Sequence, residues 1–175
     1  MSYCIAFIGS GGKTTAIEQL AKKLLAHGKT VKITTTTKMY WPTDPDLRDI
    51  YVGAPSGEAG KMRGLPEDAR RDLLDTCDCL LVEADGAKGR PLKFPREFEP
   101  VIPLEADLVV LVAGLNGIGK TVGEAVHCPE QACAFLGVLP EHIVTAADVA
   151  ALLRLYMEKA AAQVPGARLV MLFNP

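Results

Sequence analysis

The sequence has almost no net charge, because 19 Lys and Arg residues face 21 Asp and Glu residues, a balance of -2. Bulk binding to nucleic acid or to an anionic membrane needs a clear surplus of positive charge, so we expect neither partner. No apolar stretch approaches the roughly 18 residues of a membrane-spanning helix. The first residues also lack the basic segment and long apolar run of a secretory signal. These absences predict a cytoplasmic protein.

The sequence also lacks the C-x-x-C spacing of redox and zinc sites, although it contains five cysteines. An odd number of cysteines without a secretory signal fits a reducing compartment. Cys4, Cys77 and Cys79 border or enter apolar runs, where cysteine acts as a small core residue. We therefore expect these three thiols to be buried and free.

A length of 175 residues predicts one domain. Residues 3–8 are expected to form a buried strand, residues 14–27 an amphipathic helix and residues 31–36 a second strand, which is typical of a parallel pair with a right-handed crossover. Further strands are expected at 79–84, 108–113 and 168–173, and further helices at 66–76, 129–136 and 145–162. Residues 41–66 and 85–103, in contrast, read as long irregular segments.

The expected strands are almost continuously apolar and alternate with helices. Such strands are buried on both faces of a sheet. The predicted fold is therefore a three-layer α/β structure with a mostly parallel sheet of five or more strands, similar to P-loop NTPases.

A glycine-rich loop follows the first expected strand. It reads Gly9-Ser10-Gly11-Gly12-Lys13-Thr14-Thr15 and leads directly into the first helix. Glycines allow backbone N–H groups to turn towards phosphate oxygens, and the N-terminus of a helix favours an anion. We predict that these seven residues bind the phosphates of ATP or GTP, with Lys13 on the terminal phosphates and the Thr14 hydroxyl on Mg²⁺. A structural glycine turn is the alternative.

A second segment matches the full phosphate-loop spacing, Gly114-x-x-x-x-Gly119-Lys120-Thr121. Gly123 and Pro129 follow it closely and leave room for only a turn or two of helix. We therefore favour the first loop as the phosphate site, and interpret the second as a loop lining the same cleft.

Hydroxyl groups gather where the second expected strand ends, in Thr34-Thr35-Thr36-Thr37-Lys38. Threonine is common in strands, so this run has a purely structural explanation. At the carboxyl edge of a sheet, however, Thr36, Thr37 and Lys38 are suited to hold Mg²⁺ or a substrate oxyanion. We treat Thr36 and Thr37 as binding residues and Lys38 as a catalytic candidate.

The third expected strand ends in acidic residues, in the sequence Leu80-Leu81-Val82-Glu83-Ala84-Asp85. Apolar residues followed by a carboxylate are typical of the strand that holds or orients Mg²⁺ in nucleotide-hydrolysing proteins. Glu83 and Asp85 point the same way only if the strand continues through both. Both are metal candidates, and Asp85 is also a candidate for orienting a water molecule or a substrate. An acidic turn is the alternative.

A basic loop follows these acids, and includes Lys88, Arg90 and Lys93. Cations in this place can neutralise the charge that develops on a transferred phosphoryl group. We take Arg90 as a catalytic candidate and Lys88 as a binding candidate, with a solvated surface loop as the equal alternative.

Together, the segments 9–15, 34–39 and 83–93 resemble the YqeC family, and the later segments 114–120 and 127–130 fit the same pattern. This resemblance implies a cytosolic nucleotide-binding protein acting in the maturation of selenium-dependent molybdenum hydroxylases. Two positions depart from the pattern: Thr121 stands where proline is expected, and Cys128 stands where arginine is expected. Relatives usually run longer, so a C-terminally shortened chain is also expected.

The leading functional hypothesis is a Mg²⁺-dependent NTPase or NTP-dependent transferase, with nucleotide and a molybdenum hydroxylase or its cofactor as partners. One alternative is a nucleotide-gated module that delivers a cofactor or a selenium species without chemistry of its own. The short glycine loop also resembles that of Mur ligases, so an ATP-dependent ligase is a further alternative.

Overall fold

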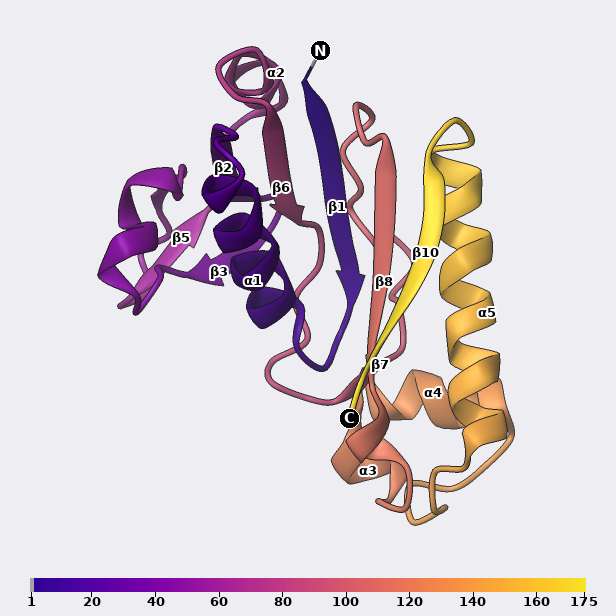
Figure 1. The fold of residues 1–175 in the computed structure, drawn as a ribbon. Coiled ribbons are helices and arrows are strands. Elements are labelled where there is room, and N and C mark those ends of the chain that lie inside the picture. The colour runs from indigo at the N-terminus through magenta and orange to yellow at the C-terminus, as the bar shows by residue number, and fades with distance from the viewer. Residues whose placement is uncertain (1) are drawn as a thin grey trace.

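A computed structural model describes residues 2–175 (Figure 1). Its central sheet has five parallel strands in the order β10-β8-β1-β6-β2. Their bounds are β1 Tyr3–Gly9, β2 Val31–Thr35, β6 Cys79–Glu83, β8 Leu108–Gly114 and β10 Arg168–Asn174. The five strands that the sequence predicts are thus all present, and every pairing between them is parallel.

Alternating residues of the central strand β1 enter two separate cores. Cys4, Ala6 and Ile8 belong to one buried cluster, whereas Ile5 and Phe7 belong to the other. Successive side chains of a strand point to opposite faces, so a strand covered on both faces must be apolar at nearly every position. This explains the continuous apolar run in the sequence.

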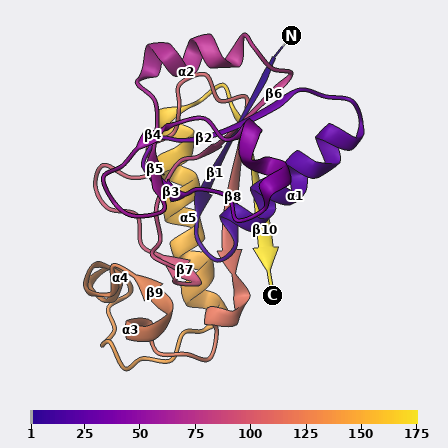
Figure 2. The same ribbon diagram turned by 90° about the vertical axis from the view of Figure 1, so that its left-hand side faces the viewer.

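Helices cover both faces of the sheet. The helix α1 (Lys13–Ala26) buries Ile17 and Ala21 against one face, while α5 (Ala146–Gln163) buries Leu152 and Tyr156 against the other. Figure 2 shows the sheet between them. The capping box between Thr145 and Asp148 defines the start of α5, as the sequence predicts. The fold is therefore the expected α/β arrangement of three layers.

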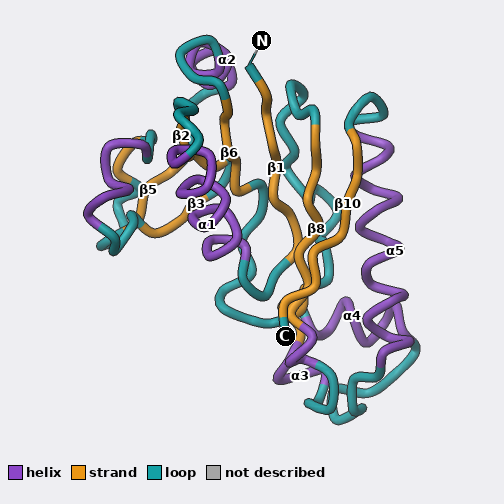
Figure 3. The backbone as a smooth tube through the Cα atoms, viewed as in Figure 1, coloured by secondary structure: helices purple, strands orange, loops and turns teal. Residues whose placement is uncertain are grey.

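The direction of the crossovers reverses in the middle of the sheet. From β1 the chain passes through α1 to β2 on one side, whereas from β8 it passes through α5 to β10 on the other. Ligands of open α/β sheets bind outside the carboxyl ends of the strands at such a reversal. The loops that follow β1, β6 and β8 gather at this end (Figure 3).

The expected loop at 41–66 is more ordered than the sequence indicates. It contains the 3-10 helix η1 (Pro45–Ile50), and together with the preceding residues it forms a small antiparallel sheet in the order β3-β5-β4. These strands are β3 Lys38–Tyr40, β4 Ala54–Pro55 and β5 Lys61–Arg63. Strands of two or three residues are too short to show a hydrophobic period, which explains why the sequence does not reveal them.

The remaining elements are short. The helices are α2 Glu67–Leu74, η2 Leu115–Gly117, α3 Val122–Ala125 and α4 Pro129–Leu136, and the strands β7 Leu92–Lys93 and β9 Val126–His127 form a parallel pair. The pair lies partly in the segment 85–103 that was expected to be irregular throughout. Cys4, Cys77 and Cys79 are buried and free, as predicted. Within residues 2–175, no helix combines the length and the apolar character needed to cross a membrane.

Candidate functional site

The glycine loop between β1 and α1 is closely packed against the end of β8. Gly9 and Gly11 have φ angles of 84° and 80°, which side chains other than glycine rarely adopt. A Cβ atom at Gly9 would lie 2.3 Å from the Val112 oxygen, and one at Gly11 would lie 2.4 Å from the Gly114 nitrogen. Both positions therefore require glycine, for conformation and for space.

The start of α1 offers free backbone donors. The residue before the helix, Gly12, provides no side-chain cap, and the first N–H with a backbone acceptor in the helix is that of Ala16, which donates to the Gly12 oxygen at 2.9 Å. Within residues 2–175, the N–H groups from Gly11 to Thr15 have no recorded acceptor. Unpaired donors at a helix N-terminus form a site suited to an anion.

The Lys13 side chain folds back over this loop. It is only 6% exposed, and its Nζ donates to the Gly9 oxygen at 2.6 Å. The same amine lies 3.3 Å from Asp85 Oδ1, a carboxylate with no solvent exposure. Asp85 Oδ2 accepts from the Gly9 N–H and from the Tyr156 hydroxyl, both at 3.2 Å. Asp85 thus ties the glycine loop, its lysine and α5 together.

A hydroxyl and a carboxylate meet on the neighbouring strand. Thr14 Oγ1 donates to Glu83 Oε2 at 2.9 Å. Burial raises the pKa of the Glu83 carboxyl, while Lys13 and the Thr14 hydrogen bond act in the opposite direction. Mg²⁺ prefers hard oxygen ligands and is usually held by one or two carboxylates, with phosphate oxygens and water completing its shell. The Thr14–Glu83 pair fits such an ion.

The charges at this edge continue as an alternating row beyond Asp85. Lys93 Nζ, whose side chain is fully buried, lies 3.8 Å from Asp85 Oδ1 and 2.9 Å from Glu99 Oε1. Arg96 Nη2 lies 2.9 Å from the same Glu99 oxygen. Burial raises the pKa of Glu99, but hydrogen bonds from Arg96 and Lys93 outweigh it and hold the pKa at about 2. Each buried carboxylate of the row therefore has a cation on either side.

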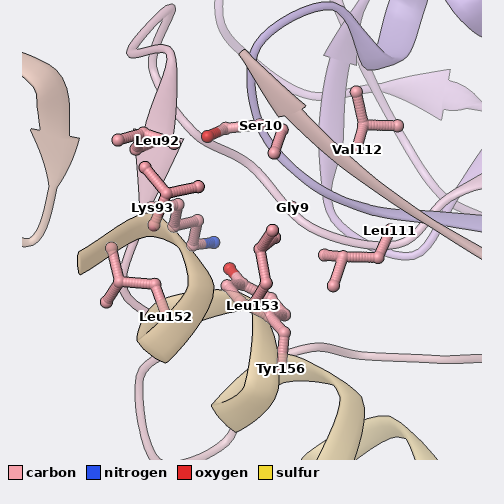
Figure 4. A pocket seen from close by; sticks show the side chains of 11 residues that line it. Gly9, Ser10, Leu92, Lys93, Leu111, Val112, Leu152, Leu153 and Tyr156 are labelled. Atoms are coloured by element: carbon pink, nitrogen blue, oxygen red, sulfur yellow. The ribbon is translucent and has the colours of Figure 1, made fainter. Parts of the chain in front are cut away.

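A small cavity lies between the glycine loop and α5. Lys93 and Tyr156 approach it from opposite sides beside Gly9 (Figure 4). Its volume is about 10 Å³, which is the space that one water molecule needs. The buried Ser10 hydroxyl also borders it, and has no hydrogen-bond partner within residues 2–175.

The structure does not bring every predicted residue together. The strand β6 ends at Glu83, so Asp85 turns to Lys13, Lys93 and Tyr156, and no contact with Thr14 is recorded. Lys38 instead pairs with Glu58 at 2.6 Å on an exposed surface. These two residues therefore occupy different surroundings from the Thr14–Glu83 pair.

Arg90 and Lys88 lie on the loop after β6. The Arg90 guanidinium donates to the backbone oxygens of Gly123 and Glu124, and so fastens this loop to α3. Lys88 is exposed and has a φ angle of 47°. Neither side chain has a recorded contact with Lys13 or Glu83, whereas Lys93 shares the Asp85 carboxylate with Lys13.

The threonine run lies beside Glu83 through its backbone. The Thr35 hydroxyl donates to the Glu83 oxygen at 2.7 Å, and the Thr37 N–H donates to the Thr35 hydroxyl at 3.0 Å. The Thr36 hydroxyl donates to the Val101 oxygen at 2.7 Å. Thr36 and Thr37 are therefore held close to the backbone of Glu83, and within residues 2–175 neither side chain has a recorded contact with Thr14 or with the Glu83 carboxylate.

Only a short helix follows the segment 114–121, as the sequence predicts. After β8 it forms the 3-10 helix η2, and Thr121 then caps α3, a helix of only four residues. Gly114 packs against Gly11 of the first loop. The second match to the phosphate-loop pattern is thus a neighbour of the first loop and precedes no helix long enough to orient an anion.

Sequence reasoning missed Glu99 and Tyr156 as residues of this site, and it did not place Asn174 at the glycine loop, which Asn174 contacts. Asn174 Nδ2 donates to the Gly11 oxygen at 3.0 Å, from the end of β10. Tyr156 has the spacing of a core residue in an amphipathic helix, and nothing local reveals that its hydroxyl reaches a carboxylate 71 positions away. Glu99 has one local indication in the sequence, since the basic residues Lys93 and Arg96 shortly precede it.

The chain is thus a parallel α/β protein with a glycine loop and an acidic strand end where the direction of its crossovers reverses. A family model described as "YqeC protein" matches residues 5–130. The chain is also 36% identical over 171 residues to "Uncharacterized protein YqeC" of Escherichia coli (strain K12), covering 86% of this chain and 67% of that relative. The chain belongs to the YqeC family.

Proposed function

We propose that this chain is a P-loop nucleotide-binding protein that binds ATP or GTP with Mg²⁺ and acts as an NTP hydrolase or an NTP-dependent transferase. One observation carries the proposal: the unpaired N–H groups from Gly11 to Thr15 lie beside a lysine and a hydroxyl–carboxylate pair at the reversal of the sheet. This combination suits a polyphosphate and its cation.

Each residue has a distinct part in this proposal. The backbone N–H groups and Lys13 hold the phosphate oxygens, and Thr14 with Glu83 holds Mg²⁺. The cation supplies positive charge against the phosphates. Because the donors are already fixed by the glycine loop, they need no rearrangement when charge develops on the phosphate.

Asp85 acts here as a positioning residue. Its oxygens are engaged by Gly9, Tyr156 and the Lys13 and Lys93 amines, which keeps the lysine at the loop. Lys93 and Lys13 both form an ion pair with the Asp85 carboxylate, so the carboxylate keeps one cation if the other moves away. Lys13 is therefore able to turn its amine towards an arriving phosphate without leaving Asp85 unpaired.

The cellular part of the proposal is maturation of selenium-dependent molybdenum hydroxylases, and membership of the YqeC family is its support. A hydrolase or transferase turns nucleotide over, whereas a delivery module binds it tightly, shows negligible turnover and retains a hydroxylase partner. A ligase produces ADP together with a joined product. Product analysis separates these three.

The test compares the protein with Lys13→Ala and with Lys23→Ala, an exposed lysine of the same helix, as the matched control. ATP or GTP with Mg²⁺ should raise the melting temperature of the protein and of Lys23→Ala, because a ligand at 100 times its Kd adds about 2.7 kcal/mol. Lys13→Ala should lose this shift together with turnover. An unchanged shift in Lys13→Ala, or no shift in any variant, would refute the phosphate site.

A further inference from the structure

A groove with a volume of about 410 Å³ lies beside the candidate nucleotide site, between the threonine run and the start of α2. Its lining includes Thr36, Thr37, Arg63, Leu65, Val101 and Leu104. We propose that this groove binds a small organic anion with an apolar body, through an ion pair with Arg63. Its volume is within the range of small-molecule sites.

One wall of the groove is formed by close backbone packing just after β5. A Cβ atom at Gly64 would lie 1.7 Å from the Thr35 oxygen, so only glycine fits there. The Gly64 N–H donates to the Thr37 oxygen at 3.2 Å. This contact fixes the backbone after Arg63 directly against the end of the threonine run.

Arg63 is the charged lining group without a protein partner. The lining residue Arg70 is neutralised by Glu105 at 2.6 Å, and Glu67 pairs with Arg71 at 2.5 Å. For the exposed Arg63 guanidinium, no hydrogen bond or ion pair is recorded within residues 2–175. The groove therefore presents one uncompensated cation, with donors arranged to bind a carboxylate or a phosphate in bidentate fashion.

The small sheet adds a second observation in favour of an anion. Lys38 of β3 stands directly opposite Arg63 of β5 in the antiparallel register, and Tyr40 stands opposite Lys61. Like charges directly opposite each other destabilise a strand pair. Glu58 compensates Lys38 and Lys61, at 2.6 and 2.7 Å, but does not pair with Arg63. An anion at Arg63 would remove the remaining repulsion.

Part of the groove lining is apolar and accessible. Leu104 is 66% exposed and Val101 is 38% exposed, and the Thr36 hydroxyl bond to the Val101 oxygen holds this segment in place. An apolar body can cover these side chains while an acidic group reaches Arg63. Both features together favour an organic anion over a bare inorganic anion or a neutral apolar molecule.

The groove adjoins the candidate nucleotide site through the threonines. The Thr36 N–H donates to the Glu83 oxygen at 3.1 Å, and Glu83 itself accepts from Thr14. The groove is therefore placed for the second substrate of the proposed nucleotide-dependent reaction. That role rests on the proposed function, whereas binding of the anion to Arg63 does not.

The experiment measures binding of naphthalene-2-sulfonate and of its neutral counterpart 2-naphthalenemethanol by calorimetry, without nucleotide. The variants are Arg63→Ala, Arg63→Lys, Leu104→Trp to fill the groove, and Arg154→Ala as the matched control, an exposed arginine on α5. We expect the sulfonate to bind more tightly than the alcohol. A lost charge-assisted bond of 1.5–3 kcal/mol weakens binding about 10- to 150-fold in Arg63→Ala.

Arg63→Lys should recover part of the affinity, Leu104→Trp should lose it, and Arg154→Ala should bind as the unaltered protein does. Equal sulfonate binding with and without Arg63, or an equal preference for the alcohol, would overturn the proposal. Nucleotide binding by the same variants is measured separately. If the groove binds the sulfonate but the protein binds no nucleotide, only the proposed function is refuted. If the protein binds nucleotide but the groove does not bind the sulfonate, only the groove proposal is refuted.

Discussion

At the scale of single residues, Asp85 is the carboxylate that balances the charge of two buried lysines. It has no solvent exposure and lies between Lys13 and Lys93, at 3.3 and 3.8 Å. Asp85→Asn keeps the shape but leaves two buried amines without their shared carboxylate. Removing one partner of a buried pair typically costs about 3–5 kcal/mol.

Urea unfolding should therefore show a loss of about 3 kcal/mol for Asp85→Asn. Asp72→Asn, at an exposed position of α2, is the control and should stay within about 0.5 kcal/mol of the unaltered protein. Equal stabilities of the two variants would show that Asp85 carries no structural charge balance.

The lowered pKa of Glu99 makes the stability of the fold depend on pH in the acid range. Its pKa is about 2 in the folded protein, below the ordinary value of 4.5. A depressed carboxyl pKa stabilises the fold above about pH 4.5, and this contribution disappears as the pH falls towards about 2. The contribution is on the order of 3 kcal/mol.

In unfolding measurements at several acid pH values, Glu99→Gln should be less stable near neutrality and should show a shallower loss below pH 4.5. The control is Glu141→Gln, at an exposed position that has no recorded ion pair within residues 2–175. An acid limb of Glu99→Gln as steep as that of the control would contradict the assignment.

At the scale of elements, the glycine loop depends on space as well as on conformation. Gly11 and Gly28 have similar φ angles of 80° and 72°, but a Cβ atom meets Gly114 at Gly11 and meets nothing within 4 Å at Gly28. Gly28→Ala should cost only the left-handed strain of about 1–2 kcal/mol.

Gly11→Ala should cost more than Gly28→Ala, and should also weaken nucleotide binding, because the loop must move away from β8. Thermal unfolding and the nucleotide-induced shift measure both effects. If the two variants behave alike in both measurements, the contact with Gly114 does not shape the loop.

The elements also show what the sequence can and cannot predict. The segments that became β1, β8 and α5 carry a long apolar run or a capping box, and each was predicted to within about two residues. The strands β3 and β7 have three and two residues, and are held by pairing to distant segments. No local period records such pairing, so these elements were missed.

At the scale of the whole molecule, the same distinction applies to the candidate site. The loop from Gly9 to Thr15 and the end of β6 are continuous motifs, and the sequence identifies them as neighbours because parallel strands end at one edge. The partners of Asp85 come from β7 and α5, and only the folded chain brings them together. The positive φ angles of the loop explain why it contains glycines, but no sequence motif identifies Tyr156 or Glu99 as residues of the site.

The strand β10 lies at one edge of the central sheet. β10 pairs with β8 along one side, and no strand pairs with its other side within residues 2–175. The consecutive side chains Val170, Met171, Leu172 and Phe173 are 38–50% exposed. An unpaired strand edge with apolar side chains on both faces is a template for association with another chain. We therefore expect the 175-residue chain to self-associate as its concentration rises.

Sedimentation velocity over a range of concentrations measures this association. Leu172→Lys and Phe173→Lys should shift the protein towards monomer with little loss of stability, because a charge on an exposed edge opposes pairing and neither side chain lies in a buried cluster. Phe135→Lys is the matched control, since Phe135 of α4 is 46% exposed but belongs to no strand edge. A monomer at every concentration, or equal effects of the three substitutions, would show that β10 is not the surface through which copies meet.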